Sequence, residues 1–192
     1  VQQASTWLQE HAIRHLRSDA RQVGVGDAFV AYAFDEKHDG RAYVAQAGQA
    51  HASAIVWQND GVSIDCAVSN LGVAQLNLLA GHIAHVFYAR PSDEMRMVAI
   101  TGTNGKTSCA QWLAQLLSVS QQKCALMGTL GVGFVDAMVE TGFTTPQAVE
   151  VHRLLREVRE QGAQAAAMEV SSHALEQGRV NGVAFDVALF TN

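Results

Sequence analysis

A glycine-rich turn between an apolar strand and a helix carries the clearest chemistry in this sequence. Residues 98–107 read Val-Ala-Ile-Thr-Gly-Thr-Asn-Gly-Lys-Thr. Glycine lets the backbone approach phosphate oxygens closely, and the helix that follows offers free N–H groups and a positive dipole end. A lysine here can reach the β- and γ-phosphates, and a threonine hydroxyl suits Mg²⁺. The turn predicts a nucleoside triphosphate site made by Gly102, Thr103, Asn104, Gly105, Lys106, Thr107 and Ser108.

The turn is shorter than the usual phosphate loop. Ile100 stands where the first glycine is expected, and only Thr103 and Asn104 separate Gly102 from Gly105. Such a turn can also be a helix entry that binds no ligand. The strand before it and the amphipathic helix after it are the context that the motif requires, so they favour the nucleotide site.

A carboxylate at the end of a second apolar strand is the next candidate. Ala165-Ala166-Ala167-Met168 leads into Glu169, and in a phosphate-loop protein a second acid associated with Mg²⁺ belongs at such a strand end. The alternative is a glutamate that is simply exposed there. Ser171 and His173 follow, but adjacent Ser and His without a strained turn do not indicate a hydrolase triad. Arginine suits a carboxylate or phosphate ligand, so we expect one site formed by Glu169, Ser171, His173, Gln177 and Arg179.

Other motifs leave alternatives open. Thr145 before Pro146 can cap a helix, and it can equally contact an anion at that helix terminus. The stretch 128–133 is either a second loop that approaches a ligand or a tight turn. His11 and His15, four residues apart on an expected helix, could bind a metal but lack an evident third ligand. His82 and His85 are expected on a helix surface.

Composition indicates a globular protein without an extreme charge. The chain has 192 residues, 48% of them hydrophobic and 16% charged, and a net charge of −5. This charge gives no reason to expect nucleic acid or an anionic membrane as a partner. The three cysteines lack metal-ligand spacing and are expected to be buried thiols. No apolar run approaches the ~20 residues of a membrane span, and the first residues do not resemble a signal peptide, so we expect a cytoplasmic protein.

The first part of the chain predicts a small α/β domain. A helix is expected over residues 6–17, with Thr6 and Gln9 as a capping box. Asp39 is expected to cap a helix that runs to about residue 50. The other elements expected here are strands over 27–33, 52–57 and 62–68 and a helix over 70–87.

The polar, proline-containing stretch 89–94 predicts a domain boundary that separates residues 1–93 from 94–192. Beyond it, strands and helices alternate as in a parallel, doubly wound sheet, whose carboxyl-end edge binds ligands. The chain stops after a core strand with no helix to cover the sheet, so we expect a fragment of a longer protein. The expected elements are strands over 95–101, 123–128, 163–170 and 185–190 and helices over 106–119 and 146–161.

These residues resemble the Mur ligases, the ATP-dependent enzymes that form amide bonds in peptidoglycan precursor synthesis. Residues 101–107 resemble their shortened phosphate loop. Residues 168–175 (Met-Glu-Val-Ser-Ser-His-Ala-Leu), with Gln177 and Arg179, resemble the members that add the third amino acid. The stretches 144–146 and 128–129 fit the same family. The resemblance covers the whole chain, strongly over 97–192 and more loosely before that.

The resemblance implies an amino-terminal uridine-binding domain ahead of a truncated phosphate-loop ATPase domain with a parallel sheet. Residues 18–21, 26–31 and 39–41 resemble the uridine-binding part, although the family has a serine where this chain has Ala20. The loop 34–38 also lacks the family's usual glycine. The acceptor positions implied in this domain are Asp19, Ala20, Arg21, Asp39 and Gly40.

The implied reaction uses ATP and Mg²⁺ to join a diamino acid, meso-diaminopimelate or lysine, to UDP-N-acetylmuramoyl-L-alanyl-D-glutamate through an acyl phosphate. Lys106 would stabilise charge on the transferring phosphoryl group, and Thr107 and Glu169 would hold Mg²⁺. The muramoyl-dipeptide end of the acceptor would contact Thr144, Thr145, Ser171, Gln177 and Arg179.

The family places an Asp-His stretch, a carbamylated lysine and a domain that selects the amino acid beyond the end of this chain. The resemblance therefore implies a fragment that does not complete catalysis alone. We expect the parent enzyme to be a monomer. Two alternatives stay open. One is another phosphate-loop ligase or small kinase, and the other is a non-catalytic module that senses nucleotide.

Overall fold

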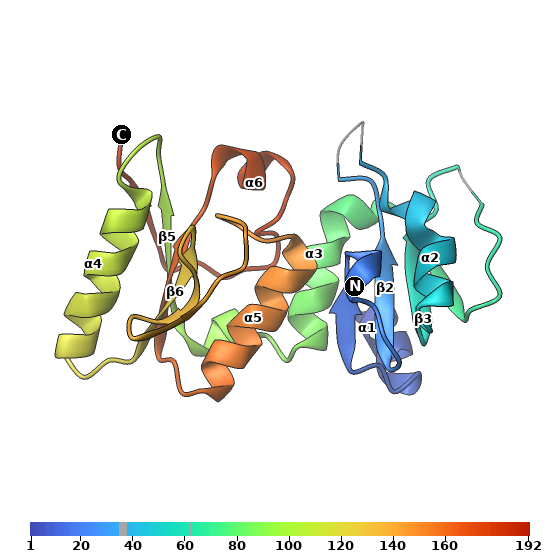
Figure 1. Cartoon of the computed structure of the whole chain (residues 1–192), viewed down its shortest axis with the longest axis horizontal. Coiled ribbons are helices and arrows are strands. Elements are labelled where there is room, and N and C mark those ends of the chain that lie inside the picture. Colours follow the sequence, from blue (N-terminus) through green and yellow to red (C-terminus); the bar gives the residue numbers. More distant parts are fainter. Residues whose placement is uncertain (35–37, 62) are drawn as a thin grey trace.

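The computed structural model describes residues 1–34, 38–61 and 63–192. Two α/β units lie side by side, each built around its own sheet, with helices α3 (Leu76–Phe87) and α5 (Ala148–Glu160) between them (Figure 1). The carboxyl terminus lies beside the turn that precedes helix α4 (Lys106–Val119) (Figure 1). The α/β fold class expected from the sequence is confirmed.

The first sheet is four-stranded and parallel, in the order β1-β2-β3-β4. Alternate residues of its strands face opposite layers, so Ala28 and Val30 pack on one side while Phe29 and Ala31 pack on the other. Helices α1 and α3 cover the first side and α2 covers the second. The elements are α1 (Gln2–Glu10), β1 (His15–Arg17), a 3-10 turn at Ala20–Gln22, β2 (Asp27–Ala31), a 3-10 turn at Gly40–Tyr43, α2 (Val44–Gln49), β3 (Ala54–Gln58) and β4 (Asn70–Val73).

The second sheet has six strands in the order β10-β5-β9-β6-β7-β8. The four strands from β10 to β6 are parallel, whereas β7 and β8 are antiparallel additions. The sheet is therefore mixed rather than wholly parallel as predicted, because the glycine-rich stretch 128–133 folds back as a hairpin. Its elements are β5 (Arg96–Thr101), β6 (Cys124–Gly128), β7 (Gly131–Phe134), β8 (Ala137–Val139), β9 (Ala165–Glu169), α6 (Ser172–Glu176) and β10 (Val187–Phe190).

Helices α4 and α5 cover opposite faces of this second sheet. Ala110 and Ala114 of α4 pack with Ile100 and the small residues of β9. The apolar stripe of α5 packs on the other face, against Met97 and Met168 among others. Strand β9 can therefore be as apolar and small as Ala-Ala-Ala-Met, because both its faces are buried.

The helix predicted over residues 6–17 is correct only as far as residue 10, and its capping box is wrong because the helix begins earlier, at Gln2. Helix α1 ends at Glu10, and Ala12 takes a positive φ of 50°. Residues 15–17 instead form β1, which pairs with β2. Leu8 and Leu16 are both buried, and their spacing fits one face of a helix. In the structure Leu8 belongs to α1 and Leu16 to β1. His11 and His15 therefore share no helix face, and no group of three potential metal ligands occurs among the described residues.

The strand predicted near residues 62–68 is also wrong for the part that is described; residue 62 lies outside it. Strand β4 begins later, at Asn70, inside the segment predicted as a helix over 70–87. Ile64, Cys66 and Val68 alternate as in a strand and pack against the α2 side of the sheet without joining it. Helix α3 correspondingly starts at Leu76.

The remaining elements lie close to their predicted positions. Asp39 accepts a hydrogen bond from the backbone N–H of Arg41, 2.9 Å away, and so caps a 3-10 turn that leads into α2. Strands β5, β6, β9 and β10 and helix α4 coincide with prediction within a few residues. Cys66, Cys109 and Cys124 are free thiols, and burial raises the pKa of Cys124 to about 11. Of the loop 34–38, residues 35–37 lie outside the described part of the chain.

The two units contact each other through α3, α5 and the 3-10 turn Pro91–Glu94. Val149 of α5 packs into the core of the first unit. Arg17 of β1 lies 3.3 Å from Glu150 of α5, across the contact. His152 is fully buried there, with Nε2 2.9 Å from the carbonyl oxygen of Asn181 and its ring against that of His85. His85, predicted on a helix surface, is therefore partly covered by α5, whereas His82 is exposed.

We expect this contact to weaken in acid. Burial lowers the pKa of His152 from 6.5 to about 4, so the unfolded chain takes up the proton first as pH falls. The folded state therefore keeps the full stability contributed by neutral His152 above pH 6.5, the pKa in the unfolded chain. It loses that contribution as the pH falls from 6.5 to about 4. We expect urea unfolding to show a loss of up to about 3 kcal/mol across this window.

His152→Gln supplies the test, because its amide can still donate to Asn181 but gains no proton. The variant should have a shallower dependence of unfolding free energy on pH than the unchanged protein. His15→Gln, at an exposed strand position, should leave that dependence as it was. An unchanged slope in His152→Gln would contradict the assignment.

Candidate nucleotide and acceptor site

The glycine-rich turn leaves strand β5 at Thr101 and enters helix α4 at Lys106. Gly102 and Gly105 have φ of +128° and +81°, which side chains other than glycine rarely adopt. A Cβ on Gly102 would also lie 2.2 Å from Oγ1 of Thr191. The two glycines are thus required by backbone shape, and they aim the first turn of α4, with its free N–H groups, at the strand ends.

Lys106 lies folded over the turn. Its Nζ donates to the carbonyl oxygens of Gly102 and Thr103, at 2.7 and 3.2 Å. These carbonyls hold the ammonium group above the turn, where a phosphate chain bound at the helix N-terminus would meet it. This geometry suits the role predicted for Lys106.

Glu169 lies at the carboxyl end of β9, the strand between β5 and β6. Glu169 is 2% exposed, so the alternative interpretation, a glutamate that is simply exposed at a strand end, is wrong. One carboxylate oxygen accepts from Oγ1 of Thr107 at 2.8 Å, and the other accepts from the backbone N–H of Thr129 at 2.9 Å. The two side chains predicted as Mg²⁺ ligands are therefore in contact. Their oxygens form the type of site that binds Mg²⁺ together with phosphate and water.

Gly128 makes room for this carboxylate. A Cβ at Gly128 would lie 2.1 Å from Oε1 of Glu169. The stretch 128–133, left open between a ligand loop and a tight turn, belongs to the β6–β7 hairpin, in which Thr129 and Leu130 connect the two strands. The backbone of Thr129 at its tip holds Glu169, and its hydroxyl lies 3.0 Å from that of Thr144.

Thr145 does not cap helix α5, which begins at Ala148 after Gln147. The hydroxyl of Thr145 is buried and donates to the carbonyl oxygen of Glu169 at 2.9 Å, and it accepts from the N–H of Ser171. The side chain of Ser171 in turn caps α6 by accepting from Ala174 N–H at 3.2 Å. Thr145 thus fixes the turn after β9 rather than presenting its hydroxyl at a helix terminus.

Arg179 is oriented by its neighbours. Its Nη1 donates to the carbonyl oxygen of Thr145 at 2.9 Å, while Nε and Nη2 donate to Oε1 of Gln177 at 2.8 and 2.6 Å. A guanidinium held in one plane is suited to bind a carboxylate or phosphate.

A cavity of about 570 Å³ is lined by residues of both units, among them Arg179. Its wall includes Gln177 and Arg179 from the second unit and the five positions predicted in the first, Asp19, Ala20, Arg21, Asp39 and Gly40. The fold therefore brings together residues that are more than a hundred positions apart. Thr144, Thr145 and Ser171 do not line this cavity. Thr145 contacts Glu169 and Ser171, and Thr144 contacts Thr129.

Two aspartates at the rim of the cavity share one arrangement. Asp19 and Asp39 each precede a 3-10 turn and pair with the arginine two residues later, at 2.7 Å. The hydrogen bonds from Arg21 and Arg41 lower the pKa of Asp19 and of Asp39. Both stay ionised near neutral pH. Arg21 is thereby held in the cavity wall, whereas Arg41 also donates to the carbonyl oxygen of Gln58 and does not line the cavity.

Several residues at the site were not predicted from sequence. Phe34, Tyr43 and Gln147 line the cavity, and nothing in their local sequence distinguished them. Thr191 and Asn192 contact the glycine-rich turn, although the sequence indicated only the end of a strand. His173, grouped with the site in the sequence, is exposed on α6 and does not line the cavity.

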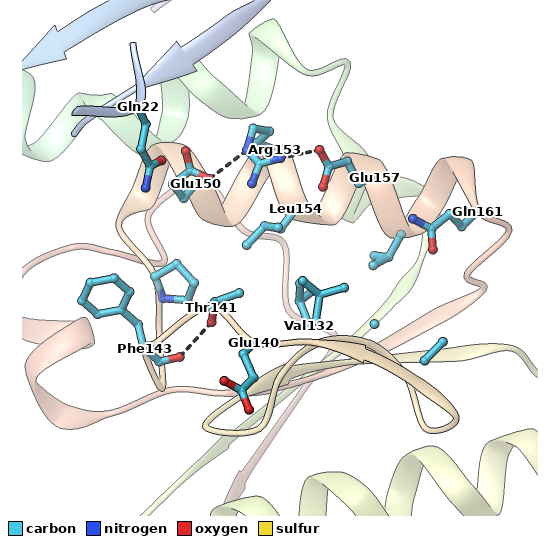
Figure 2. Close-up of a pocket in the computed structure, with 15 residues that line it drawn as sticks. Gln22, Val132, Glu140, Thr141, Phe143, Glu150, Arg153, Leu154, Glu157 and Gln161 are labelled. Atoms are coloured by element: carbon cyan, nitrogen blue, oxygen red, sulfur yellow. Dashed lines mark hydrogen bonds and ion pairs between the residues drawn. The ribbon is translucent and has the colours of Figure 1, made fainter. Parts of the chain in front are cut away.

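A second cavity, of about 460 Å³, lies between α5 and the β7–β8 hairpin (Figure 2). Figure 2 shows Arg153 between Glu150 and Glu157 along α5, with Val132 and Glu140 opposite. Gln22, Phe143, Pro146 and Glu150 line both cavities. The two hollows therefore adjoin around the N-terminal end of α5.

Comparisons with known proteins show which family the chain resembles. Residues 100–192 match the model of the Mur ligase middle domain. A UDP-N-acetylmuramoyl-L-alanyl-D-glutamate–2,6-diaminopimelate ligase of Ralstonia nicotianae is 49% identical over 194 residues, which cover 97% of this chain and 38% of that protein. A ligase of the same name from Xanthomonas oryzae pv. oryzae is 50% identical over 177 residues, covering 91% of this chain and 35% of that protein.

A solved structure of a protein with this ligase name superimposes with a TM-score of 0.77 at 30% identity, covering 94% of this chain and 36% of that chain. This chain thus spans little more than a third of the length of the relatives it matches. None of the helices among the described residues is long and apolar enough to cross a membrane. The matched middle domain and the similarity along nearly the whole chain lead to one conclusion: the chain belongs to the Mur ligase family.

Proposed function

We propose that this chain is the acceptor- and nucleotide-binding part of an ATP-dependent ligase. The parent enzyme would add meso-diaminopimelate to UDP-N-acetylmuramoyl-L-alanyl-D-glutamate in peptidoglycan precursor synthesis. The observation that carries the proposal is the contact of Thr107 with Glu169 beneath the glycine-rich turn, next to a cavity shared by both units. The names of the relatives indicate diaminopimelate rather than lysine as the added amino acid.

The acceptor would lie across the two units. Its uridine end would occupy the cavity wall formed by residues 19–21 and 39–40, and its dipeptide end would point toward Glu169. Arg179, held in plane by Gln177, would pair with an anionic group of the acceptor. Ala20 is buried and has no hydroxyl to offer the uracil ring, so binding in this part of the cavity would rest on backbone groups and shape.

The chemistry would be a phosphoryl transfer followed by an aminolysis. The D-glutamate γ-carboxylate attacks the γ-phosphorus of ATP, the bond to the β-γ bridging oxygen breaks, and ADP leaves. The amine of the diamino acid then attacks the acyl phosphate, loses a proton and expels inorganic phosphate. Lys106 would neutralise charge on the transferring group, and the helix N-terminus would hold the phosphates. Bound Mg²⁺, held by Thr107 and Glu169, would supply further charge neutralisation.

The residues that select the amino acid are proposed to lie outside this chain, in the remaining length of the parent enzyme. We therefore expect no turnover from residues 1–192 alone. ADP release that depends on both the acceptor and a diamino acid would contradict this expectation. We further expect a cytoplasmic monomer with no nucleic-acid or membrane partner.

Gly128→Ala tests the Glu169 site. The added Cβ would displace the carboxylate of Glu169 from Thr107 and Thr129, because it would lie 2.1 Å from Oε1. We expect Mg²⁺-dependent ADP binding, measured by calorimetry, to weaken by at least about tenfold, which corresponds to the loss of one charge-assisted hydrogen bond.

Gly48→Ala is the matched control. Gly48 lies in α2, and a Cβ there would meet only ordinary contact with Val68 at 3.7 Å. This variant should bind MgADP as the unchanged protein does. Equal MgADP affinity in Gly128→Ala and Gly48→Ala would show that Glu169 takes no part in holding the metal–nucleotide complex.

Arg179→Gln tests the acceptor site. We expect the unchanged chain to bind UDP-N-acetylmuramoyl-L-alanyl-D-glutamate more tightly than the nucleotide sugar without D-glutamate. Loss of the guanidinium should lower affinity for the dipeptide form by about tenfold or more, because charged hydrogen bonds contribute about 1.5–3 kcal/mol. Calorimetry measures both ligands on both proteins.

Arg96→Gln, at an exposed position where β5 begins, makes the same chemical change away from the cavity and should not alter either affinity. Equal binding of the two nucleotide sugars by the folded, unchanged chain would count against the acceptor assignment. In that case MgADP binding would still report on the nucleotide site.

A further inference from the structure

Two residues after strand β10 contact the glycine-rich turn directly. Strand β10 pairs with β5 so that Phe190 lies opposite Thr101, which carries Thr191 and Asn192 alongside the turn. Oδ1 of Asn192 accepts from the backbone N–H groups of Thr103 and Asn104, at 3.0 and 2.9 Å. One side-chain oxygen thus holds two consecutive amides of the turn.

Thr191 contacts backbone carbonyl groups at both sides of the same turn. Its Oγ1 lies 3.1 Å from the carbonyl oxygen of Thr101 and 2.6 Å from that of Asn104. The backbone N–H of Thr191 also donates to Thr101 at 2.9 Å. The turn and the end of β10 fit closely, since even a Cβ on Gly102 would collide with Thr191.

These contacts fix which backbone groups of the turn face the nucleotide. The amides of Thr103 and Asn104 are directed to Asn192, so a phosphate bound at the proposed site would meet the first amides of helix α4 instead. A turn that is already fixed loses little conformational freedom on binding, because fixing one residue's backbone costs about 1–2 kcal/mol.

We propose that Thr191 and Asn192 are positioning residues that hold the glycine-rich turn in its nucleotide-binding shape before the nucleotide arrives. The inference rests on the proposed nucleotide site for its consequence, but the preformed shape itself can be measured without any ligand. A purely structural role in anchoring β10 predicts a different result, because it would leave the turn independent of the Asn192 side chain.

Amide hydrogen exchange measured by NMR on the nucleotide-free protein is the first test. In Asn192→Ala we expect exchange at the Thr103 and Asn104 amides to be at least about tenfold faster, since each loses its hydrogen-bond acceptor. The Thr191 amide, which is bonded to Thr101, should keep its protection and so report that β10 remains paired. Unchanged exchange at Thr103 and Asn104 would overturn the inference.

Substitutions that preserve part of the contact sharpen this test. Asn192→Asp keeps an oxygen acceptor and should restore protection of both amides. Thr191→Val keeps the shape but removes the hydroxyl, and should accelerate exchange at the glycine-rich turn without affecting α4. Asn77→Ala removes the same carboxamide from α3, remote from the turn, and should change neither amide. Failure of Asn192→Asp to restore protection would contradict a role as hydrogen-bond acceptor.

The consequence for binding is measured with MgADP by calorimetry. Asn192→Ala should weaken binding by about tenfold, because the variant must order the turn on binding, while its urea midpoint stays close to that of Asn77→Ala. Faster exchange with unchanged MgADP affinity would overturn the positioning role. Absence of MgADP binding by the unchanged protein would instead reject the proposed nucleotide site, and the exchange result would stand apart from it.

Discussion

The buried carboxylate of Glu169 is the constraint on which the candidate site depends. A carboxyl group in a residue that is 2% exposed is stable only where hydrogen bonds replace its hydration. Those hydrogen bonds come from Thr107 after the glycine-rich turn and from Thr129 at the tip of a hairpin. The side chain of Glu169 therefore requires glycine at position 128 and holds the start of α4 against the end of β9, the strand between β5 and β6.

The contact between the two units shapes the cavity whose wall they share. Glu150 at the start of α5 lies against Arg17 of the first sheet and Arg153 of its own helix, and it lines both cavities. The neutral, buried His152 and the apolar Val149 complete the contact. Because the cavity wall is divided between the units, any change in their docking would alter the distance between residues 19–21 and Arg179.

The pattern of apolar residues predicted the second unit better than the first. Strands β5, β6 and β9 are buried on both faces and so read as continuous apolar runs, which have few alternative interpretations. In the first unit, buried residues of α1 and β1 together imitate one helix, and Ile64, Cys66 and Val68 imitate a strand. Thr145 matched a helix-cap pattern, but its hydroxyl is held by the turn after β9. A local sequence pattern does not show that a distant backbone group, the carbonyl of Glu169, binds this hydroxyl instead.

The sequence by itself determined the glycine-rich turn, the acid at the end of β9 and the α/β class, because each follows from residue type, spacing and hydrophobic period. Only the tertiary structure places Thr107 against Glu169, residues 19–21 and Arg179 in one cavity wall, and Asn192 against Thr103 and Asn104, 89 and 88 residues before it. These contacts depend on the register of parallel strands and on the docking of two units. Both are set by packing between segments distant in sequence, which no local pattern encodes.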